Sequence, residues 1–397
     1  MGKKFASWIP MMTNMVTISV TDCSRCEGFP PLGHLPKLRE ISIKKMENVK
    51  VIGNDLCVGL SPAQKAVTSA MYPSVTTVIL RGLPKLEEWV EDIFSKGGKD
   101  QIVFPKLEKL EISDCPRLRK FLNSCFPSLK DLSIENSESN LILETMYMHL
   151  SSLTTLDLED IRDGVGDSSS SSSCSNLESI LKVLLKNNSL SLTSLYLCDC
   201  KGLQHLTLGV PLDNLSLHDC PNLVSINAVE GLAGLKYLSL RRIPSSLLDG
   251  ISAEIRSSTL KVLWLGPFSD EFRWPFSSSL HSFPNLVKLF LKGCENVKSI
   301  ALFEQLQFFT FPALTKLFIF DFGGMKALVL SIEKLPCLET LRIKNSKDLE
   351  RVSLFDESHC LQDLFISECP ILKERYRKES GPEWFKIQHI PNITWDD

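Results

Sequence analysis

The sequence predicts an α/β solenoid, in which the chain coils through successive units that each add one strand to a parallel sheet. Leucine content is the first indication: the 397 residues include 62 leucines, a surplus that a membrane span, a coiled coil or a repeat must absorb. A membrane span is excluded because no apolar run approaches about 18 residues. The formal net charge of −3 also argues against a protein that binds polyanions through a basic surplus.

One short unit recurs along the chain and is the second indication. It reads apolar-x-x-apolar-x-apolar-x-x-Cys, where another small or apolar residue can replace the cysteine. Its two central apolar positions are two residues apart, which is the periodicity of a strand and not of a coiled coil. We find this unit fourteen times, opening at Met15, Leu38, Val75, Leu107, Leu129, Leu153, Leu192, Leu212, Leu235, Leu260, Leu286, Leu314, Leu338 and Leu361.

The spacing of the units identifies the kind of solenoid. The openings span 346 residues in thirteen steps, and a mean step of about 27 residues is the period of leucine-rich repeats. We therefore expect a leucine-rich-repeat horseshoe of about 14 repeats. A parallel β-sheet should line its concave face, and its convex side should be irregular or carry short helices.

Each position of the unit has its own expected environment. Leu110 and Ile112, at the fourth and sixth positions of one unit, should point into the solenoid, whereas Lys109 and Glu111, at the third and fifth, should point out. The ninth position bends the chain out of the strand, where a small and buryable side chain fits. Six cysteines occupy ninth positions and are thereby explained as packing residues: Cys23, Cys115, Cys200, Cys220, Cys294 and Cys369.

The regularity of the units predicts a single solenoid over residues 1–397. Long steps indicate insertions near 47–74, 90–103 and 162–191, and residues 370–397 should form a C-terminal cap. The third insertion holds six consecutive serines, followed at 176–185 by the apolar spacing of a short helix. A domain boundary at the serine run is the alternative, which we favour less because the repeat resumes unchanged after it.

Motifs of catalysis and cofactor binding are missing from the sequence. HExxH, GxSxG, GxGxxG and the phosphate-binding loop do not occur, and the seven histidines show no metal-ligand spacing. Cys23 and Cys26 form a lone CxxC without a second pair. We therefore expect no enzyme activity, no cofactor and no metal. Because the sequence has no secretory signal, we expect the chain in the cytoplasm, with the nucleus as an alternative location. We do not expect it to be secreted or membrane-bound.

The outward positions of the predicted strands divide into two sectors of opposite charge. Repeats four to six are acidic, and repeats eleven to thirteen are basic and aromatic. The acidic face, expected to contact an intramolecular or separate partner, comprises Glu111, Asp131, Glu135, Asp157 and Glu159. The candidate protein-binding face comprises Tyr196, His218, Tyr237, Trp264, Phe290, Phe318, Phe320, Arg342, Phe365, Lys288, Lys292, Lys316 and Lys344.

The fifth positions of the last five repeats are the most specific feature of that second sector. They should form a contiguous exposed ladder, because neighbouring strands are about 4.8 Å apart: Trp264, Phe290, Phe318, Arg342 and Phe365. Aromatic side chains with interleaved Arg and Lys are typical of interface hot spots. Two alternatives remain: the rings merely cover the sheet as cross-strand pairs, or they stack on single-stranded nucleic acid, which the acidic sector disfavours.

Several segments resemble one family of repeat proteins. Residues 23–59, CSRCEGFPPLGHLPKLREISIKKMENVKVIGNDLCVG, are similar to the "LPPLGxLPxLKxLxIxxMxxVKxIGxEFxG" stretch in the leucine-rich-repeat region of coiled-coil-class plant NLR (NB-LRR) disease-resistance proteins. The LEEW of 86–89, the FPxL openings at Phe104, Phe126, Phe283 and Phe311, and the ending CPIL…GPEWFKIQHIP also resemble this family.

This resemblance implies the sensing domain of an intracellular immune receptor. Such a domain would recognise a pathogen effector, or a guarded host protein that the effector modifies, and would regulate a nucleotide-binding switch domain that is absent from this chain. Because the first residues resemble a mid-solenoid segment, we expect further repeats in a longer parent. Two alternatives stay open: a substrate adaptor for ubiquitination, and a truncated regulatory or decoy relative.

Overall fold

The computed structural model describes most of the chain, in two compact units, Met1–Val210 and Pro211–Asp397. The described residues are 5, 8–29, 32–33, 35–53, 72–89, 102–122, 124–137, 139–161, 177–228, 232–244, 247, 255, 258–267, 282–293, 308–356 and 360–396. Both units have the predicted leucine-rich-repeat architecture, one strand per repeat. The serine run at 168–173 lies outside the described residues, and the single solenoid over 1–397 stays a prediction.

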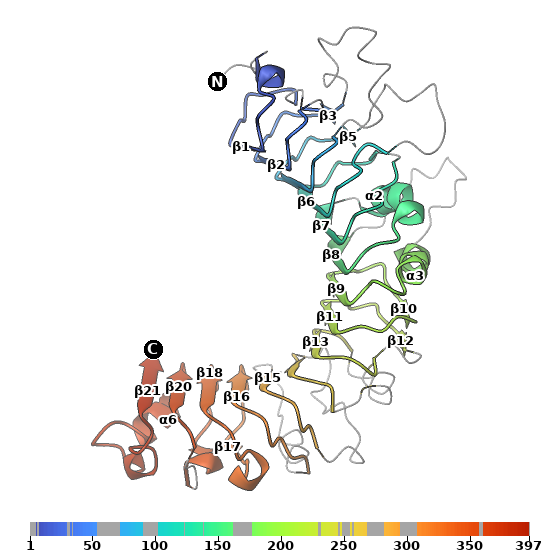
Figure 1. Cartoon of the computed structure of the whole chain (residues 1–397). Coiled ribbons are helices and arrows are strands. Elements are labelled where there is room, and N and C mark those ends of the chain that lie inside the picture. The colour runs from blue at the N-terminus through green and yellow to red at the C-terminus, as the bar shows by residue number, and fades with distance from the viewer. Residues whose placement is uncertain are drawn as a thin grey trace. The chain divides into compact units, whose positions relative to one another are not determined.

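The described residues of the first unit form seven main strands, and every neighbouring pair is parallel (Figure 1). Each strand begins at the third position of a predicted repeat. In spatial order they are β1 (Thr17–Thr21), β2 (Glu40–Lys44), β4 (Thr77–Arg81), β6 (Lys109–Cys115), β7 (Asp131–Ser137), β8 (Thr155–Ile161) and β9 (Ser194–Cys198).

In the second unit the part of the chain that the structure describes forms eight main strands, again all parallel to their neighbours. In spatial order they are β11 (Asn214–His218), β13 (Tyr237–Arg241), β14 (Val262–Leu265), β15 (Lys288–Lys292), β16 (Lys316–Phe320), β18 (Thr340–Lys344), β20 (Asp363–Ser367) and β21 (Asn392–Asp396). Strand β21 was not predicted. It belongs to segment 370–397, which was expected to cap the solenoid, and it pairs with β20 as one more strand of the sheet. The same segment also forms α6 (Pro370–Arg375) and the short helix η7 (Trp384–Lys386).

The strands pair with equivalent repeat positions side by side. Leu110 lies opposite Leu132, which lies opposite Leu156, and all three side chains are at most 1% exposed. The fourth and sixth positions thus form the continuous apolar core that the periodicity predicted. The third, fifth and seventh positions form the opposite surface, which we call the outward face.

The ninth-position cysteines are buried, as predicted, at each of the five described sites: Cys23, Cys115, Cys200, Cys220 and Cys369. Cys294 lies outside the described residues. The Cys115 Sγ donates to the carbonyl oxygen of Ser113 at 3.4 Å. Burial raises the pKa of the Cys115 thiol to about 12, so this side chain remains a neutral packing group at physiological pH.

The eighth position of the repeat has a backbone feature that the sequence analysis missed. Eleven of the described non-glycine residues there have φ between 44° and 59°, the left-handed region: Asp22, Lys45, Asp114, Asn136, Asp160, Asp199, Asp219, Arg242, Asp321, Asn345 and Glu368. Asp and Asn tolerate this region better than other residues. Their recurrence at the eighth position was therefore a readable signal of the turn that ends each strand.

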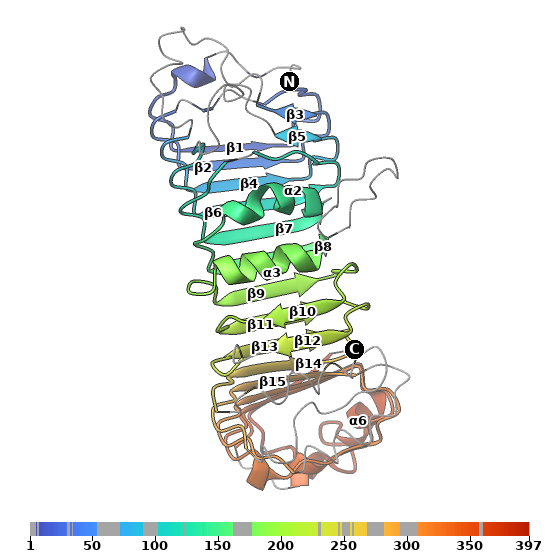
Figure 2. The ribbon, with the colours of Figure 1, turned by 90° about the vertical axis from the view of Figure 1, so that its right-hand side faces the viewer.

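The return side of each unit holds short helices and strands of two or four residues. In the first unit these are η1 (Ile9–Met11), α2 (Ser139–Met146), η3 (Tyr147–His149), α3 (Leu177–Asn187), β3 (Val51–Ile52), β5 (Glu88–Trp89) and β10 (His205–Leu208) (Figure 2). In the second they are β12 (Ser225–Ala228), β17 (Ala327–Leu328), β19 (Arg351–Val352), η5 (Ile332–Lys334) and η6 (Ser353–Asp356). Helix α3 confirms the helix predicted at 176–185. Among the described residues, no helix is long and apolar enough to span a membrane.

Candidate functional site

A stack of aromatic rings occupies the outward face of the second unit. The sheet register places Trp264 beside Phe290, and Phe290 beside Phe318. The ring centroids of the first pair are 4.4 Å apart and their planes differ by 9°. Those of the second pair are 4.3 Å apart and differ by 5°. These three residues, which we call the aromatic ladder, are thus one continuous face-to-face stack.

Guanidinium groups cover aromatic faces on both sides of the ladder. The Arg241 guanidinium carbon lies 4.9 Å from the centroid of the Trp264 ring. Further along the sheet, the Arg342 guanidinium carbon lies 4.7 Å from the centroid of Phe365. Both distances are within the range of cation–π attraction.

The aromatic ladder and Phe365 are less exposed than the sequence suggested. Trp264, Phe290, Phe318 and Phe365 are all half-buried instead of fully exposed, because the stacked rings cover one another. Phe320, at a seventh position, adds a tilted ring 6.2 Å from Phe318. The rings are therefore adjacent, as predicted, but they contact one another through their faces.

A neutral histidine holds one end of this arrangement. The Arg241 Nε donates a hydrogen bond to His218 Nε2 at 2.9 Å, and the hydroxyl oxygens of Ser216 and Ser239 lie 2.9 and 2.8 Å from the same nitrogen. Burial, and then the positive charges of Arg241 and Arg242, lower the pKa of His218 to about 4. His218 is therefore an uncharged acceptor at neutral pH that fixes the guanidinium next to Trp264.

Neighbouring acids neutralise part of the positive charge that the outward positions alone suggested for this face. Lys292 lies 3.1 Å from a carboxylate oxygen of Asp321, and Lys344 lies 3.2 Å from one of Glu368. Both acids occupy eighth positions of the following repeat, which the sequence analysis did not count. Lys288 and Lys316 stand side by side at third positions.

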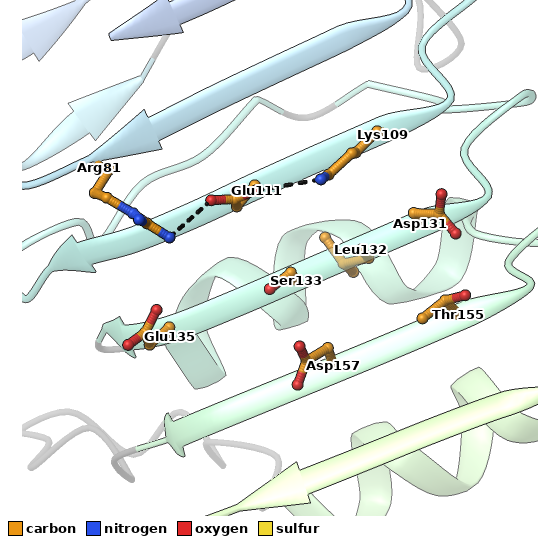
Figure 3. A pocket seen from close by; sticks show the side chains of 9 residues that line it. All are labelled: Arg81, Lys109, Glu111, Asp131, Leu132, Ser133, Glu135, Thr155 and Asp157. Atoms are coloured by element: carbon orange, nitrogen blue, oxygen red, sulfur yellow. Dashed lines mark hydrogen bonds and ion pairs between the residues drawn. The ribbon is translucent and has the colours of Figure 1, made fainter. Parts of the chain in front are cut away.

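Four of the five acids of the acidic face, Glu111, Asp131, Glu135 and Asp157, line an open pocket of about 490 Å³ in the first unit (Figure 3). Glu111 lies at one side of it and is partly neutralised: Arg81 approaches it to 3.1 Å and Lys109 to 3.4 Å. Arg81, at the seventh position of the preceding repeat, was not among the predicted residues. Asp131 accepts a hydrogen bond from the Thr154 hydroxyl at 3.3 Å.

Three other acids of this face lie close enough to repel one another. Glu135 is the register partner of Glu159, and Asp157 is on the same strand two residues before Glu159. Burial and then the charges of Glu159 and Glu111 raise the pKa of Asp157. Burial and then Glu159 also raise the pKa of Glu135. Burial and mutual repulsion therefore disfavour the charged forms of these carboxyl groups, and a basic partner would favour them.

The two predicted tyrosines lie in different units. Tyr237 lies on β13 in the second unit, beside Val262. Tyr196 lies on β9 in the first unit, where it is the register partner of Asp157. The membership of both in one binding face stays a prediction. No group of three His, Cys, Asp or Glu that could hold a metal ion occurs within the described ranges.

The fold and this repeat chemistry define a leucine-rich-repeat solenoid. The family model "R13L1/DRL21 LRRs" matches residues 1–46. A curated relative from Arabidopsis thaliana, "Putative disease resistance RPP13-like protein 1", is 28% identical over 231 residues, which are 56% of this chain and 20% of the relative.

A second Arabidopsis thaliana protein, also named as a putative disease resistance protein, is 27% identical over 137 residues, which are 34% of this chain and 9% of that protein. The matches thus cover a fifth of the first relative and less than a tenth of the second. The chain is a leucine-rich-repeat solenoid similar to those of plant disease-resistance proteins, as its motifs predicted.

Proposed function

We propose that this chain is the sensing region of a plant intracellular immune receptor of the NLR class. In this proposal it recognises a pathogen effector, or a host protein that an effector modifies, through the outward face of the second unit. The aromatic ladder is the single observation that supports this assignment most strongly. It places three large rings side by side on a face whose neighbouring strands are basic.

The physical basis of the proposal is preorganisation. Rings that stack on one another and on Arg241 lose little conformational entropy when a partner binds. Aromatic and arginine side chains also supply most of the energy of protein interfaces. The half-buried ladder can therefore present a rigid apolar surface whose edges are accessible.

The acidic face of the first unit has a second role in this proposal. Asp157, Glu135 and Glu159 would contact a basic surface of the nucleotide-binding switch domain, which this chain does not contain. Such contact would lower the mutual repulsion of the three carboxylates and would add electrostatic complementarity. It would hold the switch domain until the second unit binds its target, in the cytoplasm or the nucleus.

Replacement of two ladder rings and of Phe365 on the same row tests the recognition proposal. The triple variant Phe290→Ser, Phe318→Ser and Phe365→Ser should abolish defence-associated cell death when the parent receptor and its cognate effector are expressed together in leaves. Circular dichroism of the isolated chain checks that the variant is folded. The matched control replaces Phe308 and Phe385, which are 65% and 62% exposed outside the ladder, and should respond normally. Unchanged recognition by a folded triple variant would overturn the assignment.

A further inference from the structure

Two of the three rings in the aromatic ladder, Trp264 and Phe290, present their edges and not their faces to a partner. One face of Trp264 is covered by Phe290 and the other lies next to the Arg241 guanidinium. Phe290 is stacked on both faces, by Trp264 and by Phe318. What remains accessible on these half-buried residues is the rim of hydrogens, which carries the positive end of the ring quadrupole. An edge-on ladder therefore favours electron-rich groups such as carboxylates and carbonyl oxygens.

The charges around the ladder have the same preference. Lys288 and Lys316 flank the rings at neighbouring third positions, and Arg342 follows Phe318 in register at a fifth position. From β14 to β18 every third, fifth and seventh position is described, and none of them is acidic. The two lysines at seventh positions are already bound to acids, so Lys288 and Lys316 are the cations best placed for a partner.

We infer that this face binds an acidic peptide segment that carries apolar side chains among its carboxylates. The inference rests on the proposed function, because it uses the same face and adds the chemistry of the partner. Carboxylates would lie against Lys288, Lys316 and the ring edges, and apolar side chains would cover the flanks of the ladder. The strands from β14 to β18 span about 14 Å at about 4.8 Å per step, which an extended segment of about four residues covers.

Nucleic acid is the other polyanion that could use aromatic and basic side chains, and the geometry disfavours it. Single-stranded nucleic acids bind aromatic side chains by stacking their bases on open ring faces. The faces of Trp264 and Phe290 are occupied, so a base would have to break a stack before forming a new one. A peptide carboxylate needs no open face.

Peptide binding to the full chain tests the inference directly. The probe is a fluorescein-labelled 12-residue peptide of Glu, Ser and Phe, and binding is measured by fluorescence anisotropy. Two matched peptides carry Gln or Lys in place of Glu, and an oligothymidylate of equal charge represents nucleic acid. We expect the acidic peptide to bind at least about tenfold more tightly than the other three, and more weakly as salt rises from about 0.05 M to about 0.5 M.

Charge reversal locates the site. The double variant Lys288→Glu and Lys316→Glu should weaken binding of the acidic peptide by at least about tenfold, and the milder Lys288→Gln and Lys316→Gln variant should act in the same direction. The matched control reverses the same amount of charge at the exposed Lys326 and Arg351, which lie in or beside the separate β17–β19 sheet. That control should bind as the wild type does.

Each contrary result has a defined meaning. The inference is overturned if the acidic peptide does not bind, if the Gln or Lys peptide binds equally well, if the oligothymidylate binds more tightly, or if the folded charge variant and the control lose binding equally. The cell-death assay separates this from the proposed function. If the triple variant loses effector recognition but the wild type shows no preference for the acidic peptide, the proposed function is supported and only the acidic partner is rejected.

Discussion

Arg241 lies over Trp264, with its guanidinium carbon 4.9 Å from the ring centroid, while its Nε is hydrogen-bonded to His218. The end of the aromatic ladder is therefore fixed by a histidine that must stay neutral to accept that bond. Protonation would place a second positive charge beside Arg241. This relationship makes the second unit sensitive to acid.

Replacement of His218 by Asn should reduce that sensitivity. The pKa of His218 is lowered to about 4 in the fold, whereas histidine in the unfolded chain has a pKa of about 6.5. Between these two pH values the unfolded chain therefore binds a proton at His218 and the folded chain does not. The contribution of His218 to stability is thus complete above about pH 6.5 and is lost as the pH falls toward 4. The urea midpoint, followed by circular dichroism, should fall less between pH 7 and pH 4.5 in His218→Asn than in the wild type.

The control for this prediction replaces the exposed His205 on β10 by Asn. It should keep the pH dependence of the wild type, because the effect is assigned to the contact between His218 and Arg241. Equal pH dependence of His218→Asn and wild type would show that protonation of His218 is not what the fold resists.

Asp157→Asn should stabilise the first unit at neutral pH. The raised pKa of Asp157 means that its charged form is disfavoured in the fold, by burial first and then by Glu159 and Glu111. Removing the charge should raise the thermal midpoint at pH 7. The gain should vanish below about pH 4, where Asp157 is protonated in the folded and unfolded states alike. Scanning calorimetry at both pH values measures it, and a variant less stable than wild type at pH 7 would refute the repulsion argument.

Asn188→Ala should destabilise the first unit strongly. The Asn188 side chain is 1% exposed and bonds three backbone groups: it accepts from the Leu153 nitrogen at 2.8 Å and donates to the carbonyls of Leu150 and Leu184 at 3.0 and 2.9 Å. Loss of these partners should lower the free energy of unfolding by about 3 kcal/mol or more. Asn187→Ala, at an exposed neighbour, should cost less than about 0.5 kcal/mol in the same urea titration.

Gly293→Ala should destabilise the second unit through a steric clash. A Cβ at Gly293 would lie 2.6 Å from a ring carbon of Phe322 and 2.9 Å from the carbonyl oxygen of Asp321. Overpacking of this kind costs about 1–3 kcal/mol. Gly234→Ala is the matched control because nothing lies within 4 Å of its added Cβ. Equal urea midpoints for the two variants would mean that the Phe322 ring moves aside without cost.

The repeat positions were predictable because they depend on local periodicity. Apolar residues two apart, recurring about every 27 residues, placed Leu110 and Ile112 inside and assigned Trp264, Phe290 and Phe318 to one row. The row is confirmed by the strand register. The return side was less predictable: spacing revealed α3, but β21 lay in a segment without the repeat pattern.

Side-chain partners on the outward face were the part that local patterns could not give. Asp321 neutralises Lys292 and Arg81 neutralises Glu111, although each partner belongs to a neighbouring repeat and a different repeat position. Strand periodicity places the third, fifth and seventh positions on the outward face and says nothing about the eighth. Two acids at this position, Asp321 and Glu368, form ion pairs with lysines of the preceding repeat.

The sequence by itself determined the leucine-rich-repeat solenoid and the set of residues that share each row. Both follow from the alternation of apolar residues and the spacing of the repeats, which are properties of the sequence. Only the tertiary structure decided how the members of a row meet. It stacked the ladder face to face, placed Arg241 between a neutral His218 and Trp264, and left the three rings half-buried. The physical reason is that rotamers and ion pairs depend on neighbours brought together by the strand register, and a periodic pattern contains no information about their orientation.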